Sequence, residues 1–367
     1  MRVLVLEKGA KPLAKVRVSG GGRCNLTHRC TDIREFIKNY PRGGRELIGP
    51  FSRFGPTETV EWFEAHGVPL VTGEDGRLFP RSDTSADVIS ALLRSGAKIR
   101  LNTEVAQVGD FDGGFTIKLT SGEQLSCKAL LVATGGGAFI EGLGHTVEPC
   151  VPSLFTFSTS DKDLTALAGI VIEDVCVSTG KLKANGPLLI THTGVSGPAV
   201  LRFSSFGARA LAEDQYRFEM RINWVPSQSE AQVFGTLENH RAASPRQRVG
   251  TWSPVGLSAR LWKLLVRRAG IDETREWGAC PIKALRSIAA QVNGFTLPII
   301  GKNRHREEFV TCGGIRLTEI NFKTMESRLV PDLYFAGEVL DIDALTGGFN
   351  LQAAWTTGYL AAQSMIA

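Results

Sequence analysis

The 367-residue sequence has no run approaching the ~20 consecutive apolar residues of a membrane span. It has no C-x-x-C pair, and its seven cysteines form an odd, scattered set. This argues against a disulfide framework and a zinc ribbon, and it favours a reducing compartment. No internal repeat and no signal peptide are visible. Together these absences predict a soluble, cytoplasmic protein that does not contact a membrane.

The composition is that of a folded globular chain. Apolar residues make up 43% and charged residues 22%, which excludes a disordered, collagen-like or coiled-coil protein. A single core stops growing near this length, so two domains, or one domain with a large insert, are expected. Glycine is in excess, at 40 residues, and gathers in a few short runs.

The formal net charge is +5. Residues 241–277 alone hold eight basic and three acidic residues, so this one segment could account for the whole excess. The pattern is most typical of a solvated helical face, and an anion- or nucleic-acid-binding surface is the alternative.

The chain reads as an α/β domain interrupted by an insert. Residues 1–150 mix strands, helices and glycine turns, starting with residues 2–7, which predict a buried parallel strand. Alternating segments in 151–305 (153–157 and 216–221) predict antiparallel sheet, and helical patterns follow. Residues 306–367 return to a buried strand and a final helix.

Two helices are predicted in the first part of the chain. Residues 57–66 follow a helical pattern with Thr57 as N-cap, and residues 85–95 follow one with Ser85 as N-cap. The final helix is expected to begin at about Asn350.

Four segments have the residue types that cofactor chemistry needs. The first is the strand end at Glu7, where a carboxylate can accept hydrogen bonds from a ribose hydroxyl, although an ordinary strand end is the alternative. In the second, Ser19–Asn25 (SGGGRCN), three glycines expose backbone N–H groups, and Arg23 can reach a phosphate or a flavin carbonyl. The third, Leu131–Gly136, is a buried strand that runs into a glycine turn.

The fourth segment, Phe335–Gln352, is the most specific. It joins a strand, a Gly-Glu pair, an acidic turn and a Gly-Gly helix start. It therefore supplies a carboxylate, bare amides and a positive helix end, which would stabilise negative charge on a reduced flavin.

At these segments the sequence resembles the two-domain FAD flavoproteins that include a bacterial aminoacetone oxidase and a 3-dehydro-bile-acid reductase. The resemblance covers nearly the whole chain, and residues 18–28 and 335–355 are its most specific parts. It implies an α/β, FAD/NAD(P)-binding Rossmann-like domain of the glutathione-reductase type, formed by residues 1–150 and 306–367. Residues 151–305 would be a mixed β-plus-helical insert domain.

The resemblance implies a flavin-dependent oxidoreductase. Flavin N5 would pass a hydride between NAD(P)H, or a small amine or enone-type substrate, and an acceptor. Glu7 would bind the adenosine ribose, Glu338 the ribityl-phosphate side, and the amides of Gly347–Leu351 the pyrimidine edge. The expected FAD-binding residues are Glu7, Lys8, Gly21, Gly22, Arg23, Cys24, Asn25, Val105, Ala133, Thr134, Gly135, Gly337, Glu338, Asp343, Gly347, Gly348, Phe349, Asn350 and Leu351.

No catalytic residue can be assigned from the sequence. The candidates for the substrate pocket are His192, Thr193, Ser196 and Cys24, although a turn fixed by its glycines explains the first three equally well. Cys24, His28 and Cys30 have a spacing that a metal site might use. No fourth ligand is visible nearby, so we expect no metal site.

The sequence departs from the family in three ways. Family members begin with a strand and a G-x-G-x-x-G helix about twenty residues before the position of Glu7, and this chain has no such motif. The segment after Gly137 is short, and Ala344 and His28 replace the usual Gly and Asn. Without the first strand and its glycine turn, we expect residues 1–367 alone to be poorly soluble or molten and to lack flavin.

Two alternatives follow. The chain could be an N-terminally truncated or inactive flavoprotein, or an RNA-associated flavoprotein that uses the basic helices of 241–277. A small-molecule substrate is favoured over nucleic acid, and the oligomeric state is not predicted. Residues 152–157 are similar to members from photosynthetic organisms, so a targeting segment upstream of Met1 would place the protein in the plastid stroma.

Overall fold

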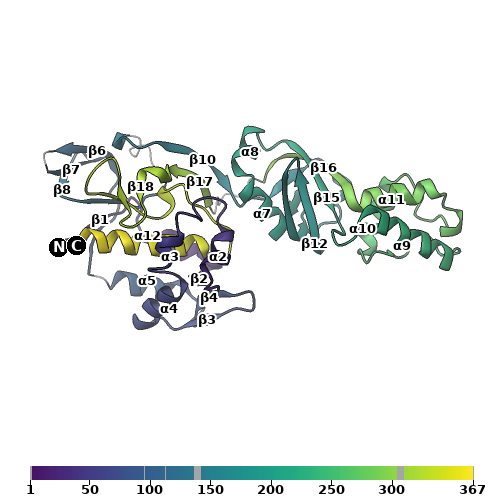
Figure 1. Ribbon diagram of the computed structural model, residues 1–367, viewed down its shortest axis with the longest axis horizontal. Coiled ribbons are helices and arrows are strands. Elements are labelled where there is room, and N and C mark those ends of the chain that lie inside the picture. Colours follow the sequence, from purple (N-terminus) through teal and green to yellow (C-terminus); the bar gives the residue numbers. More distant parts are fainter. Residues whose placement is uncertain (1, 95, 112, 136–141, 304–309, 367) are drawn as a thin grey trace. The chain divides into compact units, whose positions relative to one another are not determined.

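The structure is a computed structural model that describes residues 2–94, 96–111, 113–135, 142–303 and 310–366. The chain divides into two compact units (Figure 1). The first comprises Met1–Val151 and Val310–Ala367, and the second comprises Pro152–Phe309.

Small sheets build the first unit. Two strand pairs are parallel, β1 (Leu4–Leu6) with β5 (Lys98–Arg100) and β9 (Leu130–Val132) with β20 (Leu333–Phe335). The sheet of β9 and β20 continues through β19 (Glu326–Ser327) to β18 (Ile320–Asn321). The other sheets are β2 (Thr27–His28), β4 (Arg77–Pro80) and β3 (Leu70–Thr72); β6 (Val105–Phe111), β7 (Gly114–Leu119) and β8 (Gln124–Cys127); and β10 (Val147–Ser153) with β17 (Val310–Ile315).

Short helices connect these sheets, and one long helix ends the chain. The long helix is α12 (Phe349–Ile366), which confirms the predicted start near Asn350. Its Leu360 and Ala361 are fully buried in the same core as Phe335 of β20. The shorter helices are α1 (Ala14–Val18), η1 (Ser19–Gly22), α2 (Ile33–Phe36), η2 (Ile37–Asn39), α3 (Ile48–Phe51), α4 (Pro56–Ala65), α5 (Ser85–Leu93), η5 (Leu317–Glu319) and η6 (Gly337–Val339).

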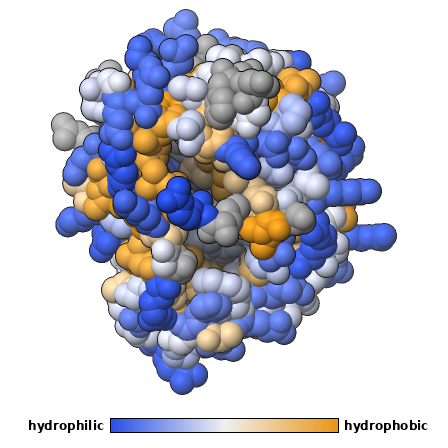
Figure 2. Space-filling view, turned by 90° about the vertical axis from the view of Figure 1, so that its left-hand side faces the viewer, coloured by the Kyte–Doolittle hydropathy of each residue, from blue (hydrophilic) through white to orange (hydrophobic). Residues whose placement is uncertain are grey.

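The strand β1 is parallel, as predicted, but it is not buried. Val3, Leu4 and Val5 expose 48%, 42% and 42% of their surface. Within the described residues β1 pairs only with β5, and β9 pairs only with β20. A parallel strand is buried when both of its edges and both of its faces are covered. β1 lies on the side of the first unit that Figure 2 shows, where the surface is hollowed and bordered by apolar residues.

The two predicted helix caps are each wrong by one or two residues. In α4, Gly55 is the N-cap and Pro56 opens the helix, which suits a residue without an N–H group. The Glu58 carboxylate accepts a hydrogen bond from the Gly55 N–H at 2.8 Å, so Thr57 is not needed as a cap. In α5 the cap is Thr84, whose hydroxyl accepts from the Ala86 N–H at 3.3 Å.

The second unit is a closed six-stranded barrel followed by helices. In spatial order the barrel strands are β11 (Phe157–Thr159), β14 (Gly194–Ser196), β13 (Leu182–Ile190), β12 (Val171–Thr179), β15 (Phe218–Asn223) and β16 (Phe295–Lys302). The alternation in 216–221 predicts β15, which is confirmed. The predicted strand 153–157 is interrupted, because Leu154 has a left-handed φ of 60° and the chain turns there between β10 and β11.

The helices of the second unit pack on this barrel core. They are α6 (Lys162–Thr165), α7 (Pro198–Phe206), α8 (Ala208–Glu213), α9 (Glu230–Ala243), α10 (Ala259–Arg268), η4 (Trp277–Ala279) and α11 (Ile282–Gly294). In α10 Leu261, Leu264 and Leu265 are buried in the core of the second unit. No helix among the described residues is long and apolar enough to span a membrane.

Candidate functional site

The glycine-rich segment forms a tight loop around a buried cysteine. Gly20, Gly21 and Gly22 have φ of 58°, 70° and 90°, a region that glycine adopts at little cost. Cys24 also has a left-handed φ, of 61°, and its N–H donates to the Ser19 carbonyl at 2.9 Å. Burial raises the pKa of the Cys24 thiol to about 11. Cys24 therefore remains a thiol at neutral pH and supports the loop, which disfavours its predicted place in the substrate pocket.

This loop contacts the start of α12, from the other end of the chain. The Asn25 side-chain oxygen accepts from the Gly348 N–H at 2.9 Å in the amide orientation that satisfies both of its neighbours. A Cβ on Gly348 would lie 2.6 Å from the Thr27 carbonyl oxygen, so only glycine allows this approach. The His28 ring stacks on Phe349 with centroids 5.2 Å apart. The structure thus brings together the two most specific motifs.

A buried amide fixes this contact. The Gln352 side chain accepts from the Thr27 hydroxyl at 2.6 Å and donates to the hydroxyls of Thr59 (2.8 Å) and Thr356 (3.0 Å). All four residues are fully buried. A polar group without partners costs about 1–3 kcal/mol when buried, so this satisfied network holds α12 against β2 and α4. No sequence signal identified Gln352 as its centre.

The other two motifs lie at the ends of parallel strands. Val132 of β9 pairs with Phe335 of β20, so the residues that follow them emerge at one sheet edge. Ala133, Thr134 and Gly135 follow β9, and Gly337 and Glu338 follow β20. The carboxyl ends of parallel strands are where open α/β sheets bind ligands. Gly136 lies outside the described residues.

The acidic residues at the strand ends already have protein partners. The Glu7 carboxylate accepts from the Gly9 N–H at 2.6 Å, within its own turn. Glu338, whose side chain is 19% exposed, forms an ion pair with Lys15 of α1. Lys8 is exposed and pairs with Glu104 at 2.6 Å.

Other predicted cofactor residues shape the site through their contacts with protein. Asp343 is fully buried and forms an ion pair with Arg42. The Asn350 amide both accepts from the Ala344 N–H and donates to the Ala344 carbonyl, each at 2.9 Å, which closes the acidic turn. The Arg23 guanidinium lies over the Phe79 ring at 4.4 Å.

The remaining predicted residues differ in burial. Phe349 is part of the core of the first unit, and Val105 and Leu351 are half-buried and pack against core clusters.

The other three pocket candidates lie in the second unit. His192 and Thr193 are exposed, and Ser196 of β14 is half-buried. The Thr193 hydroxyl accepts from the Asn303 side-chain amide at 2.9 Å. The structure places them at the barrel of the second unit.

A cavity of about 400 Å³ opens beside the contact between the loop and α12. The His28 ring lies at its wall: its Nδ1 accepts from the Cys30 N–H at 3.1 Å, so its Nε2–H donates to the Asp75 carbonyl at 3.1 Å. Both ring nitrogens are therefore used, and among the described residues no group of three or more His, Cys, Asp or Glu could hold a metal. The cavity is lined by His28, Cys30, Glu35, Asn39, Asp75, Arg77, Thr346, Gly347 and Phe349.

Sequence reasoning missed the polar lining of this cavity. Glu35, Asn39, Asp75 and Arg77 come from α2, η2 and the hairpin between β3 and β4, which carry no glycine motif. The only signal was the position of His28 within the segment 18–28.

The glycines at these strand and loop ends leave room for a cofactor. Among the atoms that the structure describes, a Cβ on Gly21 or Gly135 would meet none within 4 Å, and one on Gly337 would meet only Ala354 Cβ at 3.7 Å. All three have φ of 70–74°. Open space at these glycines, with the carboxylate of Glu338 beside Gly337 in the sequence, fits a flavin and its ribose hydroxyls.

Known proteins match the chain along almost its whole length. The family model described as "HI0933-like protein Rossmann domain" matches residues 1–364. The chain is 29% identical over 385 residues to a ribosomal RNA dihydrouridine synthase of Escherichia coli (strain K12), with 100% of this chain and 92% of the relative covered. A protein of the same description from Haemophilus influenzae is 30% identical, with coverages of 99% and 92%. A 3-dehydro-bile acid delta(4,6)-reductase of Clostridium scindens is 28% identical, again with 99% and 92% covered.

Similarity to solved structures is more remote. A 3-ketosteroid-delta4-(5alpha)-dehydrogenase from Rhodococcus jostii RHA1 aligns with a TM-score of 0.45 and 12% identity, covering 100% of this chain and 92% of that one. That likeness is too remote to carry an argument about function. The family match confirms the predicted resemblance and the Rossmann-like fold. The chain therefore belongs to the HI0933-like Rossmann-domain family of flavin-dependent oxidoreductases.

Proposed function

We propose that the protein is a reductase that uses FAD and either NADH or NADPH to saturate a carbon–carbon double bond conjugated with a carbonyl group. The observation that supports this function is the polar cavity beside Gly347 and Phe349, where the two glycine segments meet. FAD bound along these segments, once reduced by NADH or NADPH, would supply a hydride from N5. The cavity would hold a small ring beside it.

Cys30 is the residue in this cavity that can supply the proton. Burial raises the pKa of the Cys30 thiol, so it stays protonated at neutral pH. Its sulfur lies 3.5 Å from the Asp32 carbonyl oxygen, which orients the S–H group. The hydride would add to the β-carbon of the double bond and the thiol proton to the α-carbon, and the thiolate would regain a proton from water. One NAD(P)H is oxidised for each double bond reduced.

The names of the relatives point to two kinds of substrate. Two are described as ribosomal RNA dihydrouridine synthases and one as a 3-dehydro-bile acid delta(4,6)-reductase. A uracil base and a cyclic enone both contain a double bond conjugated with a carbonyl group. A small cyclic enone suits the cavity in the first unit, and uracil in RNA is the second candidate, favoured by the exposed arginines of the second unit described below.

The test is turnover by the full chain reconstituted with FAD, with oxygen excluded. We expect NADH or NADPH to be consumed only when cyclohexenone or another conjugated ketone is added, with the saturated ketone as product. Cys30→Ala should lower kcat by about 10²–10⁴ and leave reduction of the bound flavin unchanged.

Cys127→Ala is the matched control, because Cys127 is a half-buried thiol of β8 outside the cavity. Equal kcat in the two variants would remove Cys30 from the reaction. Oxidation of an amine with oxygen as acceptor, and no reduction of conjugated ketones or of RNA uracil, would overturn the proposed function.

A further inference from the structure

We infer that the second unit carries a surface for single-stranded RNA, formed by Trp252 and the arginines Arg241, Arg246, Arg248 and Arg275. The inference deepens the second candidate of the proposed function, because it gives an RNA substrate a place to bind. It rests on how the structure divides the basic residues of segment 241–277.

Four of the eight basic residues in segment 241–277 bind partners inside the second unit. The Glu273 carboxylate forms ion pairs with Arg267 at 3.2 Å and with Lys263 at 3.8 Å. Arg268 pairs at 2.7 Å with Asp161, whose side chain is only 3% exposed. Arg260 of the same helix donates to the Ala166 carbonyl at 2.8 Å. The positive charges of α10 are therefore largely balanced by partners within the second unit.

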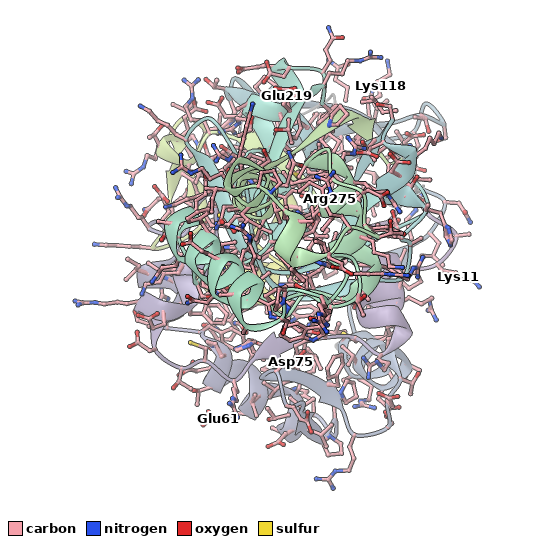
Figure 3. All side chains as sticks on the ribbon, turned by 90° about the vertical axis from the view of Figure 1, so that its right-hand side faces the viewer. Lys11, Glu61, Asp75, Lys118, Glu219 and Arg275 are labelled. Carbon is pink, nitrogen blue, oxygen red and sulfur yellow. The ribbon has the colours of Figure 1, made fainter. Side chains whose placement is uncertain are left out.

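The other four arginines project charge to solvent. Arg246, Arg248 and Arg275 are exposed and Arg241 is half-exposed, and none forms an ion pair with another described residue. The acids of the same segment are Asp272, Glu273 and Glu276. Glu273 is taken by Arg267 and Lys263, and hydrogen bonds from Thr274 together with the charge of Arg275 lower the pKa of Asp272. Figure 3 looks onto this end of the second unit and labels Arg275.

Backbone hydrogen bonds hold these arginines together. The Val249 N–H donates to the Arg275 carbonyl at 2.8 Å, and the Gly278 N–H donates to the Pro245 carbonyl at 2.8 Å. The segment around Arg246 and Arg248 therefore runs beside the segment of Arg275. Arg241 lies in the last turn of α9, which leads into Pro245.

Trp252 adds an exposed aromatic ring to this cluster. It exposes 53% of its surface, although burying a tryptophan is strongly favourable. The His240 ring lies 5.3 Å from it, and a 2.8 Å contact between His240 Nε2 and the Gln247 side-chain oxygen orients that histidine. The indole is therefore positioned at the surface and keeps a face available for stacking.

Cationic side chains around an exposed aromatic ring are what a single-stranded nucleic acid needs. The guanidinium groups neutralise phosphates, and a base stacks on the indole. A duplex hides the faces of its bases, so it could use the charges alone. An apolar protein partner would need a continuous apolar patch, whereas the exposed residues Arg246, Arg248 and Arg275 of this segment are charged.

The experiment measures binding of a fluorescein-labelled oligouridine of about twelve nucleotides to the full chain by fluorescence anisotropy at several salt concentrations. We expect salt-dependent binding that is tighter than to a duplex of the same length or to heparin. Trp252→Ala should weaken it roughly five- to hundred-fold, and Trp252→Phe should retain most of the affinity. Changing Arg246, Arg248 and Arg275 to Ala should weaken it and reduce the salt slope by up to about 2.

The matched control is the triple variant Lys181→Ala, Lys183→Ala and Arg217→Ala, which removes the same charge from exposed positions around the barrel. If the control weakened binding as much as the arginine variant, binding would depend on net charge alone and the inference would fail. It would fail equally if duplex and heparin bound as tightly as the oligouridine. Absence of binding to the wild-type chain would also overturn it. Reduction of cyclohexenone is measured separately and needs no RNA, so failure of the RNA surface and failure of the proposed reductase are distinguishable.

Discussion

Replacing Gly348 with alanine tests whether the glycine loop and α12 are locked together as the structure shows. Gly348 has a φ of +89°, and a Cβ there would lie 2.6 Å from the Thr27 carbonyl oxygen. Gly21 is the matched control, because its φ is +70° but a Cβ there meets no atom within 4 Å. Both variants place alanine in a left-handed conformation, which lowers the stability of the fold. Only Gly348→Ala must also displace the neighbouring backbone.

The expected loss of stability can be worked out from these contacts. A left-handed alanine costs about 1–2 kcal/mol, and this is all that Gly21→Ala should lose. Gly348→Ala adds about 1–3 kcal/mol for the collision. It also loses about 0.5–1.5 kcal/mol from the hydrogen bond between its N–H and Asn25. The total is about 3–6 kcal/mol, out of about 5–15 kcal/mol for a typical domain.

Thermal unfolding without FAD, followed by tryptophan fluorescence, measures the difference free of ligand effects. The extra cost of Gly348→Ala over Gly21→Ala is about 1.5–4.5 kcal/mol. At about 2–4 °C per kcal/mol for a unit of this size, Gly348→Ala should therefore melt at least about 3 °C below Gly21→Ala. Gly21→Ala should instead lose FAD affinity, because its methyl group would enter the open space of the loop. Melting temperatures within about 2 °C of each other would refute the proposed contact.

Two further predictions concern single side chains. Glu338→Ala should weaken FAD retention about ten- to hundred-fold, since a hydrogen bond to a charged group contributes about 1.5–3 kcal/mol; equal retention in Glu338→Ala and the exposed control Glu173→Ala would remove Glu338 from the site. Burial lowers the pKa of His145, whose Nε2 accepts from the Ser327 hydroxyl at 2.8 Å. Its contribution to stability is therefore full above the unfolded pKa of about 6.5 and is lost as pH falls toward the lower folded value. His145→Gln should flatten the fall in melting temperature between about pH 7 and pH 5, whereas His192→Gln at an exposed position should leave it unchanged.

The sequence predicted the elements whose signals are local. The helix α12 and the strand β15 follow directly from residue periodicity. The glycine runs were predicted as segments whose backbone N–H groups can approach a ligand, and in the structure Gly21, Gly135 and Gly337 have left-handed φ values. Cap positions were less secure, because α4 starts with a proline whose missing N–H moves the cap to the residue before it.

Contacts between distant segments could not be predicted in the same way. In the sequence, Asp343 lies beside a glycine turn and was predicted to bind FAD. Arg42 is far from it in the sequence, and only the folded chain brings the two together and buries the ion pair. Gln352 looks like an ordinary helical residue until Thr27 and Thr59 surround it. Closure of the barrel depends on the pairing of β11 with β16, which are the first and last barrel strands in the sequence. The alternation of apolar and polar residues within a strand does not indicate which strand it pairs with.

The same limit explains β1, and there the structure leads to a final prediction. Residues 3–6 are all apolar, so their pattern predicts a buried strand. Within the described residues, however, β1 has a partner strand on one edge only. An apolar strand with an open edge pairs readily with other chains. We therefore expect concentration-dependent self-association of residues 1–367, and we expect Val3→Lys together with Val5→Lys to suppress it. The cost in stability should be small, because these side chains are already 48% and 42% exposed.

Ile48→Lys is the control for this pair, because Ile48 is equally exposed, at 42%, but belongs to the helix α3 and borders no open strand edge. Light scattering against protein concentration measures the effect. If exposed apolar area alone caused association, Ile48→Lys should reduce scattering in proportion to the one side chain it replaces. If the open edge causes it, charge on β1 should act far more strongly, because each lysine in the strand opposes the ladder that two chains would form. Equal suppression per substitution at both places would show that β1 is not the site of association.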